Sequence, residues 1–375
     1  MNAPFAPALD VAVARSLDGF AALEPDWDAL HDESGRTNPF LSYAWTRACF
    51  DEECGGAEPF ILTLRRGGKL LGVAPLCIDR RFGFRILRFI AEDRSDYLGF
   101  LCDNGSQAIE RQLMAELPKI GERWDLVVLR NLAQPFTAIA ATGADRGLQY
   151  HRARWTTAAY CRWAGDWDSL LESGPEWLKQ MRNRCRRFLK KGRTVRCFTG
   201  AEAAEWLGAV AQIEAKSWKG REGVARFQPG PGQEILRNAF LASSSQLELS
   251  LAFADNRAIA FQIDFLTPER LWMYQYSYDE AYATLRAGSV LQYMSIERAW
   301  QRGVREYDLM MGAESYKANR TTAVRAIDCV AGHPRTVRGY LAYWLLLAPR
   351  WKLRHVRLLK AAQAKWKRLR LKVSH

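Results

Sequence analysis

The order of predicted strands and helices occurs twice along this chain, and that repetition limits the possible folds more than any single motif does. In each half, a strand and helical segments precede a set of consecutive strands, and a helix and a further strand follow them. The consecutive strands are predicted at 60–66, 69–78, 85–90 and 97–102, and again at 247–254, 258–266 and 270–278. The sequence therefore predicts a mixed α/β fold built from two copies of one topology.

Glycine and proline mark several element ends. Gly67-Gly68 between two apolar strands predicts a tight hairpin turn. Pro175 is well placed to open a cationic helix at 176–191, which Gly192 would end. A helix at 289–301 is expected to end in the same way, at Gly303.

The composition around 165–174 favours a boundary between the halves. With 375 residues, the chain is long for one domain. We therefore expect an N-terminal domain at 1–164, a second domain at 165–333 and a basic tail at 334–375.

The net charge of +13 is unevenly distributed. Residues 334–375 contain twelve Lys or Arg and no acidic residue, so residues 1–333 carry a net charge of only +1. A second basic island, 179–196, holds nine Lys or Arg and no acid. Because the body is almost neutral, the charge does not point to a DNA-binding protein.

Several classes of protein lack their sequence signals here. The eight cysteines form no CxxC pair, the five histidines have no HExxH or HxxxH spacing, and no GxSxG motif is present. We therefore expect no metal site and no serine-hydrolase elbow. The N-terminal segment does not resemble a signal peptide, and no apolar stretch is as long as a membrane span. These features favour a cytoplasmic protein.

The segments between 247 and 320, in their order along the chain, resemble the acetyltransferase domain of the CelD-like proteins. The matching parts include the aromatic strand to Tyr278, the turn Arg286-Ala287-Gly288, the pair Tyr307-Asp308 and the segment 314–317. An earlier match is Ser217-Trp218-Lys219. That group belongs to the GNAT superfamily, is related to the FemAB peptidyltransferases and is associated with cellulose or exopolysaccharide synthesis.

The resemblance implies tandem GNAT-like domains in a FemAB-like arrangement and an N-acetyltransferase activity. Acetyl-CoA would be the acyl donor, and no metal would be needed. The acceptor would be an amine, expected to be an amino sugar of an exopolysaccharide or of its lipid-linked precursor.

The turn before the helix at 289–301 is the expected acetyl-CoA site. Backbone N–H groups at a helix start can face an anion, and the resemblance assigns the CoA pyrophosphate to this place. The assigned residues are Arg286, Gly288 and Ser289, with Tyr278 on the preceding strand. The usual signature has a second glycine where Val290 stands. An ordinary turn that caps the helix is the structural alternative.

The expected catalytic residues follow the strand at 306–310. Acyl transfer to an amine needs a base, a group that stabilises the oxyanion and a proton for the thiolate. Asp308, Glu314, Tyr316 and Lys317 are candidates for these roles, and the resemblance matches Tyr316-Lys317 to an aromatic-lysine pair at FemAB active sites. Tyr276 is a further candidate, although it and Tyr278 could instead be core aromatics. Asp308 could cap a turn, and Glu314 and Lys317 could form a surface pair.

The acceptor is expected to meet the basic island. Arg182, Arg186 and Lys190 lie on one stripe of the predicted helix, and FemAB relatives use the corresponding segment against acceptor phosphates. Trp218 is included among the substrate-binding candidates. A solvated basic face is the structural alternative for the stripe.

The tail combines a Trp/Leu stripe with basic residues from Trp351 onward, a pattern typical of helices in a membrane interface. We expect it to anchor the protein at an anionic membrane surface, on the inner face of the cytoplasmic membrane. Docking on the protein's own body is the alternative. Two other functions remain open: an aminoacyl-tRNA-dependent transferase of the FemAB type, and a degenerate GNAT fold that responds to a cyclic dinucleotide.

Overall fold

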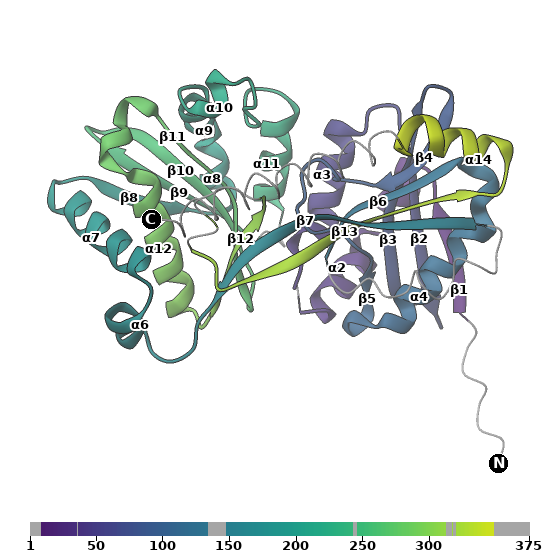
Figure 1. The fold of residues 1–375 in the computed structure, drawn as a ribbon, viewed down its shortest axis with the longest axis horizontal. Helices are drawn as coiled ribbons and strands as arrows, with labels where there is room; N and C mark the ends of the chain where they lie inside the picture. Colours follow the sequence, from purple (N-terminus) through teal and green to yellow (C-terminus); the bar gives the residue numbers. More distant parts are fainter. Residues whose placement is uncertain are drawn as a thin grey trace, which may run out of the picture.

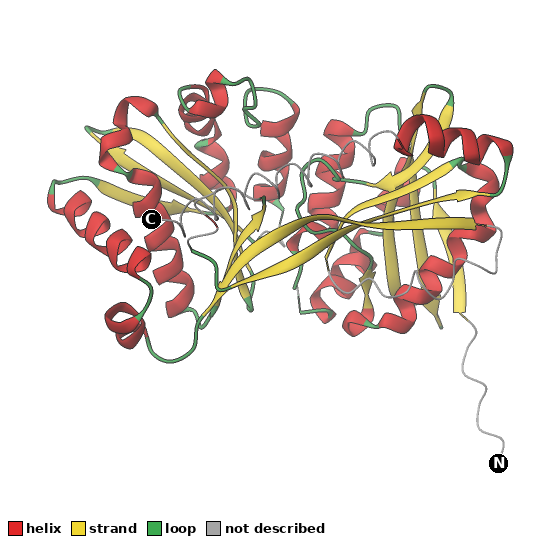
Figure 2. Cartoon of the chain, in the orientation of Figure 1, coloured by secondary structure: helices red, strands yellow, loops and turns green. Residues whose placement is uncertain are grey.

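The computed structural model describes residues 9–35, 37–133, 148–242, 246–312, 317 and 320–348. Figure 1 shows two lobes joined by a pair of long strands. All strands belong to one 13-stranded mixed sheet, in the order β1-β2-β3-β4-β6-β13-β7-β12-β11-β10-β9-β8, with β5 paired to β3. Figure 2 shows the helices lying against the sheet in both lobes. The predicted mixed α/β fold is confirmed.

The first lobe contains β1 (Leu9–Ala14), α1 (Leu17–Ala21), α2 (Glu24–Glu33), η1 (Pro39–Leu41), α3 (Tyr43–Glu53), β2 (Glu58–Arg66), β3 (Lys69–Arg81), β4 (Phe84–Phe89), β5 (Leu101–Cys102), η2 (Asp103–Gly105), α4 (Gln107–Glu116), η3 (Leu117–Arg123) and β6 (Leu126–Ala133). The hairpin of β2 and β3 turns at Gly67-Gly68, as predicted, with positive φ at both glycines. The strand predicted at 97–102 is wrong except for its last two residues. Its first part instead runs beside β6, where Leu98 donates to the Asn131 carbonyl at 2.7 Å, and the Tyr97 side chain reaches Asp308 on β12.

The second lobe contains α6 (Trp167–Ser173), α7 (Glu176–Lys190), β8 (Thr194–Phe198), α8 (Gly200–Glu205), α9 (Leu207–Ala215), α10 (Trp218–Arg221), α11 (Pro231–Leu241), β9 (Leu247–Ala254), β10 (Arg257–Leu266), β11 (Arg270–Tyr278), η4 (Glu280–Leu285), α12 (Ala287–Gln301) and β12 (Glu306–Met311). Helix α7 follows Pro175 and ends at Lys190, as the sequence predicts. It packs along α12 on one face of the sheet.

The two lobes exchange strands at the centre of the sheet. Strand β7 (Leu148–Arg162) runs antiparallel to β13 (Ala323–Pro334) along most of its length. The C-terminal end of β7 pairs with β12 of the second lobe, whereas the C-terminal end of β13 pairs with β6 of the first. Each lobe is thus completed by strands that cross between the lobes (Figure 1).

The two faces of the sheet are covered differently. On one face, a continuous core joins α1–α4 of the first lobe to α8, α9 and α11 of the second. On the opposite face, α7 and α12 cover the second lobe, and α14 (Val337–Ala342) with η5 (Tyr343–Leu347) covers the first. The start of the predicted tail is therefore docked on the sheet, and Ala342 and Leu347 are buried there. The amphipathic stripe from Trp351 onward lies outside the described residues.

Candidate functional site

Strands β11 and β12 are parallel neighbours that separate. They pair only from Arg270 to Trp272 on β11, opposite Glu306 to Asp308 on β12. Beyond Trp272, no described strand replaces β12 on this edge of β11. Two diverging parallel strands leave backbone groups exposed at the point where they separate.

The turn between β11 and α12 lies at this opening. Arg286 has a φ of 55° and occupies the left-handed region, which is unusual for a residue with a side chain. Ser289 donates its backbone N–H to the Arg286 carbonyl at 2.9 Å. In the described part of the chain, the amides of Ala287 and Gly288 make no hydrogen bond, so the helix start presents donors to a ligand.

A pocket opens beside this helix start. Tyr276 and Tyr278 form one side of it, and Gly288 lies within ordinary contact distance of both rings. Of the two alternating pairs on β11, the tyrosines therefore face the pocket, whereas Ser277 is buried. The structure brings together all the residues predicted to bind the donor with the predicted catalytic Tyr276. The full lining is Tyr276, Tyr278, Ala283, Arg286, Ala287, Gly288, Ser289, Gln292 and Arg320.

Cations surround the pocket. Arg184 on α7 donates to the Ser289 hydroxyl at 3.1 Å. Burial lowers the pKa of the Arg184 guanidinium, and the charges of Arg286, Arg320 and Arg187 lower it further. A second hollow next to the first shares Arg286 and is lined by Arg184, Arg187, Phe188, Lys191, Arg193, Thr284 and Leu285. Neither of these two linings, as described, includes an acidic side chain, so the region favours an anion.

The predicted acceptor stripe lies on other sides of α7. Arg186 and Lys190 are exposed, and Arg182 is half-buried near Tyr293. Trp218 is exposed on α10. None of these four residues lines the two cationic hollows. The α7 arginines that line the second hollow are instead Arg184 and Arg187, and Arg184 also contacts Ser289 on α12.

Lys317 follows β12 in the sequence. Its side chain is buried and donates to the carbonyl oxygens of Met310 and Met311. Arg320, a turn later, lines the donor pocket and donates to Gln292 Oε1 at 2.6 Å. Lys317 therefore lies only three residues before a residue of the pocket. Glu314 and Tyr316 lie outside the described residues.

Asp308 lies in a buried ionic network. Its carboxylate accepts from the Tyr97 hydroxyl at 2.8 Å, from Arg325 at 2.6 Å and from the backbone N–H of Met310 at 2.8 Å. Arg270 lies 3.9 Å away. Because these groups occupy the carboxylate and come from both lobes, Asp308 is placed to hold the lobes together. Its catalytic role stays a prediction.

The sequence did not single out Asp96. This half-buried residue of the first lobe accepts from the Met311 backbone N–H at 2.9 Å. Burial raises the pKa of its carboxyl to about 6, although the nearby charges of Lys317 and Arg226 oppose the shift. A carboxyl with such a pKa can accept a proton near neutral pH. No local motif marks it, because its neighbours come from the other lobe.

Lys219 is another residue that shapes the site at β11, and its segment was part of the sequence resemblance. Its ammonium donates to the Tyr276 carbonyl at 3.1 Å and to Gln275 Oε1 at 2.7 Å. It therefore fixes β11 at the edge where that strand leaves β12.

The described residues contain neither a metal-binding cluster nor a membrane-spanning helix. No group of three or more His, Cys, Asp or Glu side chains in them could hold a metal ion. None of the described helices combines the length and apolarity needed to cross a bilayer.

Residues 178–318 match the family model described as "Acetyltransferase (GNAT) domain". This segment contains most of α7, the diverging strands and all the pocket residues except Arg320. No sequence among the curated proteins matches the chain.

Solved structures share the fold at low sequence identity. FemX has a TM-score of 0.63 and 12% identity, covering 86% of this chain and 98% of its own. The C-terminal domain of a putative lysylphosphatidylglycerol synthetase from Agrobacterium fabrum has a TM-score of 0.55 and 10% identity, covering 85% and 95%. L-PGS from Bacillus licheniformis has a TM-score of 0.54 and 11% identity, covering 83% and 92%. Residues 178–318 are therefore similar to GNAT acetyltransferase domains, and the chain shares its overall fold with FemX.

Proposed function

We propose that the protein transfers an acyl group from an acyl-CoA, in the first instance acetyl-CoA, to an amine. The observation that carries the proposal is the pocket at the start of α12, where diverging strands, two backbone amides and Arg286 meet. Its positive lining suits a pyrophosphate, and the gap between β11 and β12 suits the extended arm of the donor. The match of this segment to the GNAT domain supports the same assignment.

The reaction needs one proton acceptor and one proton donor. The amine nitrogen would attack the thioester carbonyl, forming the C–N bond and breaking the C–S bond, while the amine gives up a proton and the thiolate gains one. Asp96 is a candidate to take the proton, because its pKa is raised toward neutrality and it contacts the Met311 backbone at the end of β12. Lys317 and the open edge of β11 near Tyr276 would stabilise the oxyanion.

Asp308 would act by positioning. Its bonds to Tyr97 and Arg325 fix β12 against the first lobe, and Lys317 donates to the carbonyls of Met310 and Met311 at the end of β12. Tyr316 and Glu314 stay candidates from the sequence for orienting the acceptor.

We propose an amino sugar of an exopolysaccharide or of its lipid-linked precursor as the acceptor. This rests on the resemblance to the CelD-like group. The cytoplasmic face of the membrane would be the place of action. Arg182, Arg186, Lys190 and Trp218 are proposed to meet acceptor phosphates or rings from outside the donor pocket.

A second candidate follows from the width of the positive surface. The hollow formed by Arg187, Lys191 and Arg193 extends the cationic lining beyond the helix start. A charged tRNA, as proposed for a FemAB-type transferase, or a cyclic dinucleotide would also find phosphate contacts there.

Thermal stabilisation by a ligand panel separates these functions. A ligand that binds only the native state raises the melting temperature of the protein, by an amount that grows with the logarithm of the ratio of ligand concentration to Kd. We expect acetyl-CoA to stabilise the protein and tRNA or cyclic di-GMP to have no effect at equal phosphate concentration. Stabilisation by tRNA alone would support the FemAB-type reaction instead.

A further inference from the structure

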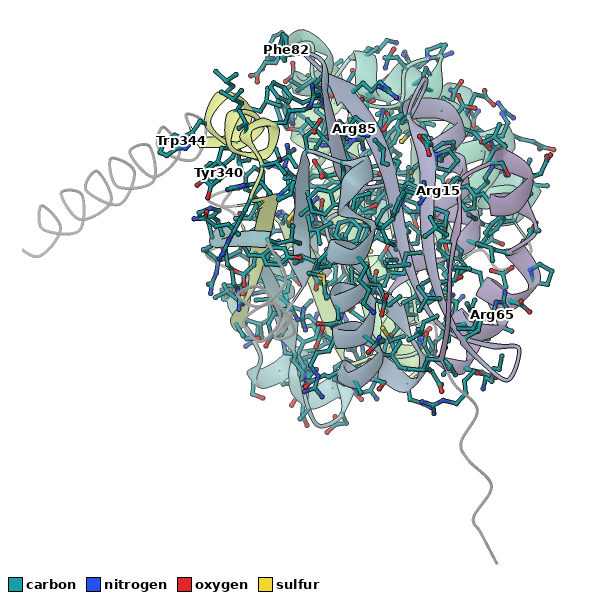
Figure 3. The ribbon with its side chains drawn as sticks, turned by 90° about the vertical axis from the view of Figure 1, so that its right-hand side faces the viewer. Arg15, Arg65, Phe82, Arg85, Tyr340 and Trp344 are labelled. Carbon is teal, nitrogen blue, oxygen red and sulfur yellow. The ribbon has the colours of Figure 1, made fainter. Side chains whose placement is uncertain are left out.

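An exposed apolar surface lies on the first lobe, far along the sheet from the donor pocket. Helix α14 and η5 bury one side on the sheet and turn the other outward. Figure 3 shows Tyr340 and Trp344 projecting from this helix, with Phe82 at the tip of the neighbouring hairpin. We call the outward residues the apolar face: Phe82, Val337, Tyr340, Leu341, Trp344 and Leu345.

The side chains of the apolar face are unusually open for their size. Phe82 is 88% exposed, Leu345 63% and Trp344 55%. Phe82 also has a φ of 51°, so a bulky ring occupies a turn position that favours glycine or asparagine. Folding gains nothing from a phenylalanine here. Contiguous exposed apolar residues of this kind mark interaction surfaces.

The hairpin and the helix form one surface. Arg338 on α14 donates to the Gly83 carbonyl at 2.8 Å and lies over the Phe84 ring. Between the two elements, the face continues into an apolar pocket that Phe82, Ile86, Leu126, Val128, Trp155 and Leu346 help to line. Arg88, Arg130 and Glu92 also line this pocket, and Glu92 pairs with Arg130 at 2.7 Å.

The charges around the apolar face are predominantly positive. Arg80 and Arg335 are exposed, and neither pairs with a carboxylate among the described residues. Arg81 is offset by Asp79, while Arg85 and Arg338 share the buried Asp125. The chain beyond the helix, 349–375, adds ten Lys or Arg and no acid. An apolar centre can insert at the headgroup level of a bilayer, and a cationic border is attracted to anionic lipids.

We propose that the apolar face docks the protein on an anionic phospholipid bilayer, with Phe82, Trp344 and Leu345 inserted at the headgroup level. The arginines of the border contact lipid phosphates, and the pocket beside Leu346 offers space for part of an acyl chain. The docking surface is thus composed of two elements distant in sequence, rather than of the C-terminal segment alone. The proposal does not depend on the acyl-transfer reaction.

The test is flotation of the full chain with lipid vesicles. Leu345 on the apolar face and Leu241 in the other lobe are a matched pair of exposed leucines. Phe82→Ser and Leu345→Ser, singly and together, remove apolar surface from the face. Leu241→Ser removes a side chain of similar exposure, 55%, from α11 in the other lobe. The vesicles contain equal parts of phosphatidylglycerol and phosphatidylcholine, with pure phosphatidylcholine for comparison. Because the substituted residues are exposed, the variants should keep the wild-type melting temperature, which is measured alongside.

We expect the wild type to float with the anionic vesicles and the double variant to partition at least about tenfold less, since each side chain loses apolar burial. Leu241→Ser should behave as wild type. Equal flotation of the double variant and the wild type would overturn the proposal, and so would a wild type that does not float. A wild-type dimer that Phe82→Ser and Leu345→Ser convert to a monomer, without any effect on flotation, would show that a second copy covers the face instead.

Discussion

The contact between Tyr97 and Asp308 joins the two lobes, and removing it should destabilise the protein. Both side chains are buried, and the hydroxyl lies 2.8 Å from both carboxylate oxygens. Tyr97→Phe removes a hydrogen bond to a charged group, which costs about 1.5–3 kcal/mol. Asp308→Asn also leaves Arg325 and Arg270 with Glu306 as their remaining carboxylate. Breaking a buried ion pair from one side costs about 3–5 kcal/mol.

The two substitutions should not be additive. Once Asp308 is an amide, the Tyr97 hydroxyl loses its charged acceptor, so its later removal costs less. We expect the double variant to be about 1–2 kcal/mol more stable than the sum of the single effects implies, as is usual for residues in direct contact.

Urea unfolding followed by tryptophan fluorescence measures the three free energies of unfolding at one pH. Tyr340→Phe is the control, because that hydroxyl makes no hydrogen bond among the described residues and is partly exposed. If Asp308→Asn changes the free energy of unfolding by less than about 1 kcal/mol, the network carries no stability and the reasoning from burial is wrong. A large loss of kcat in such a stable variant would show that Asp308 acts in catalysis.

Three further outcomes follow from other buried polar groups. Lys317→Met keeps the aliphatic stem, so kcat should fall about a hundredfold while the free energy of unfolding changes by about 1–3 kcal/mol; unchanged activity per folded molecule would make Lys317 structural. Asp96→Asn should abolish the rise of kcat/KM through about pH 6 that the raised pKa of this carboxyl implies, and an unchanged pH profile would exclude Asp96 as the base. Burial raises the pKa of Asp264 from 3.8 to about 7, so the native state holds a proton that the unfolded state releases and wild-type stability should fall as pH rises from about 4 to about 7. Relative to wild type, Asp264→Asn should therefore gain about 2–4 kcal/mol of unfolding free energy between these pH values, and a pH-independent difference in urea unfolding would contradict the burial argument.

Local periodicity predicted most of the elements. The hairpin at Gly67-Gly68, the helix after Pro175 and the helix ending before Gly303 depend on turn chemistry and apolar spacing within short windows. The donor-binding residues were predictable for a related reason, because the turn 286–289 is continuous in sequence with the strand and helix that frame it.

The contacts between the lobes were not predictable in this way. Asp96 acquires its surroundings from Met311 and Lys317, which lie more than 200 residues away in sequence. The exchange of β7 and β13 depends on pairings between distant strands, which periodicity does not encode. On α7, the stripe of Arg182, Arg186 and Lys190 has helical spacing, but the packing of α7 on α12 turns Arg184 and Arg187 toward the pocket instead.

The affinity of acetyl-CoA for two variants at Gly288 that are matched in size and differ in charge tests the central claim most directly. A Cβ at Gly288 would lie 3.6 Å from the Tyr276 ring, an ordinary contact, so a side chain fits and points into the pocket. Gly288→Asp places a carboxylate beside the proposed pyrophosphate, whereas Gly288→Asn places a neutral group of the same size. Titration calorimetry should show the Asp variant binding acetyl-CoA at least about tenfold more weakly than the Asn variant, a difference of about 1.4 kcal/mol. Equal affinities for two folded variants would contradict the assignment of the donor phosphates to the start of α12.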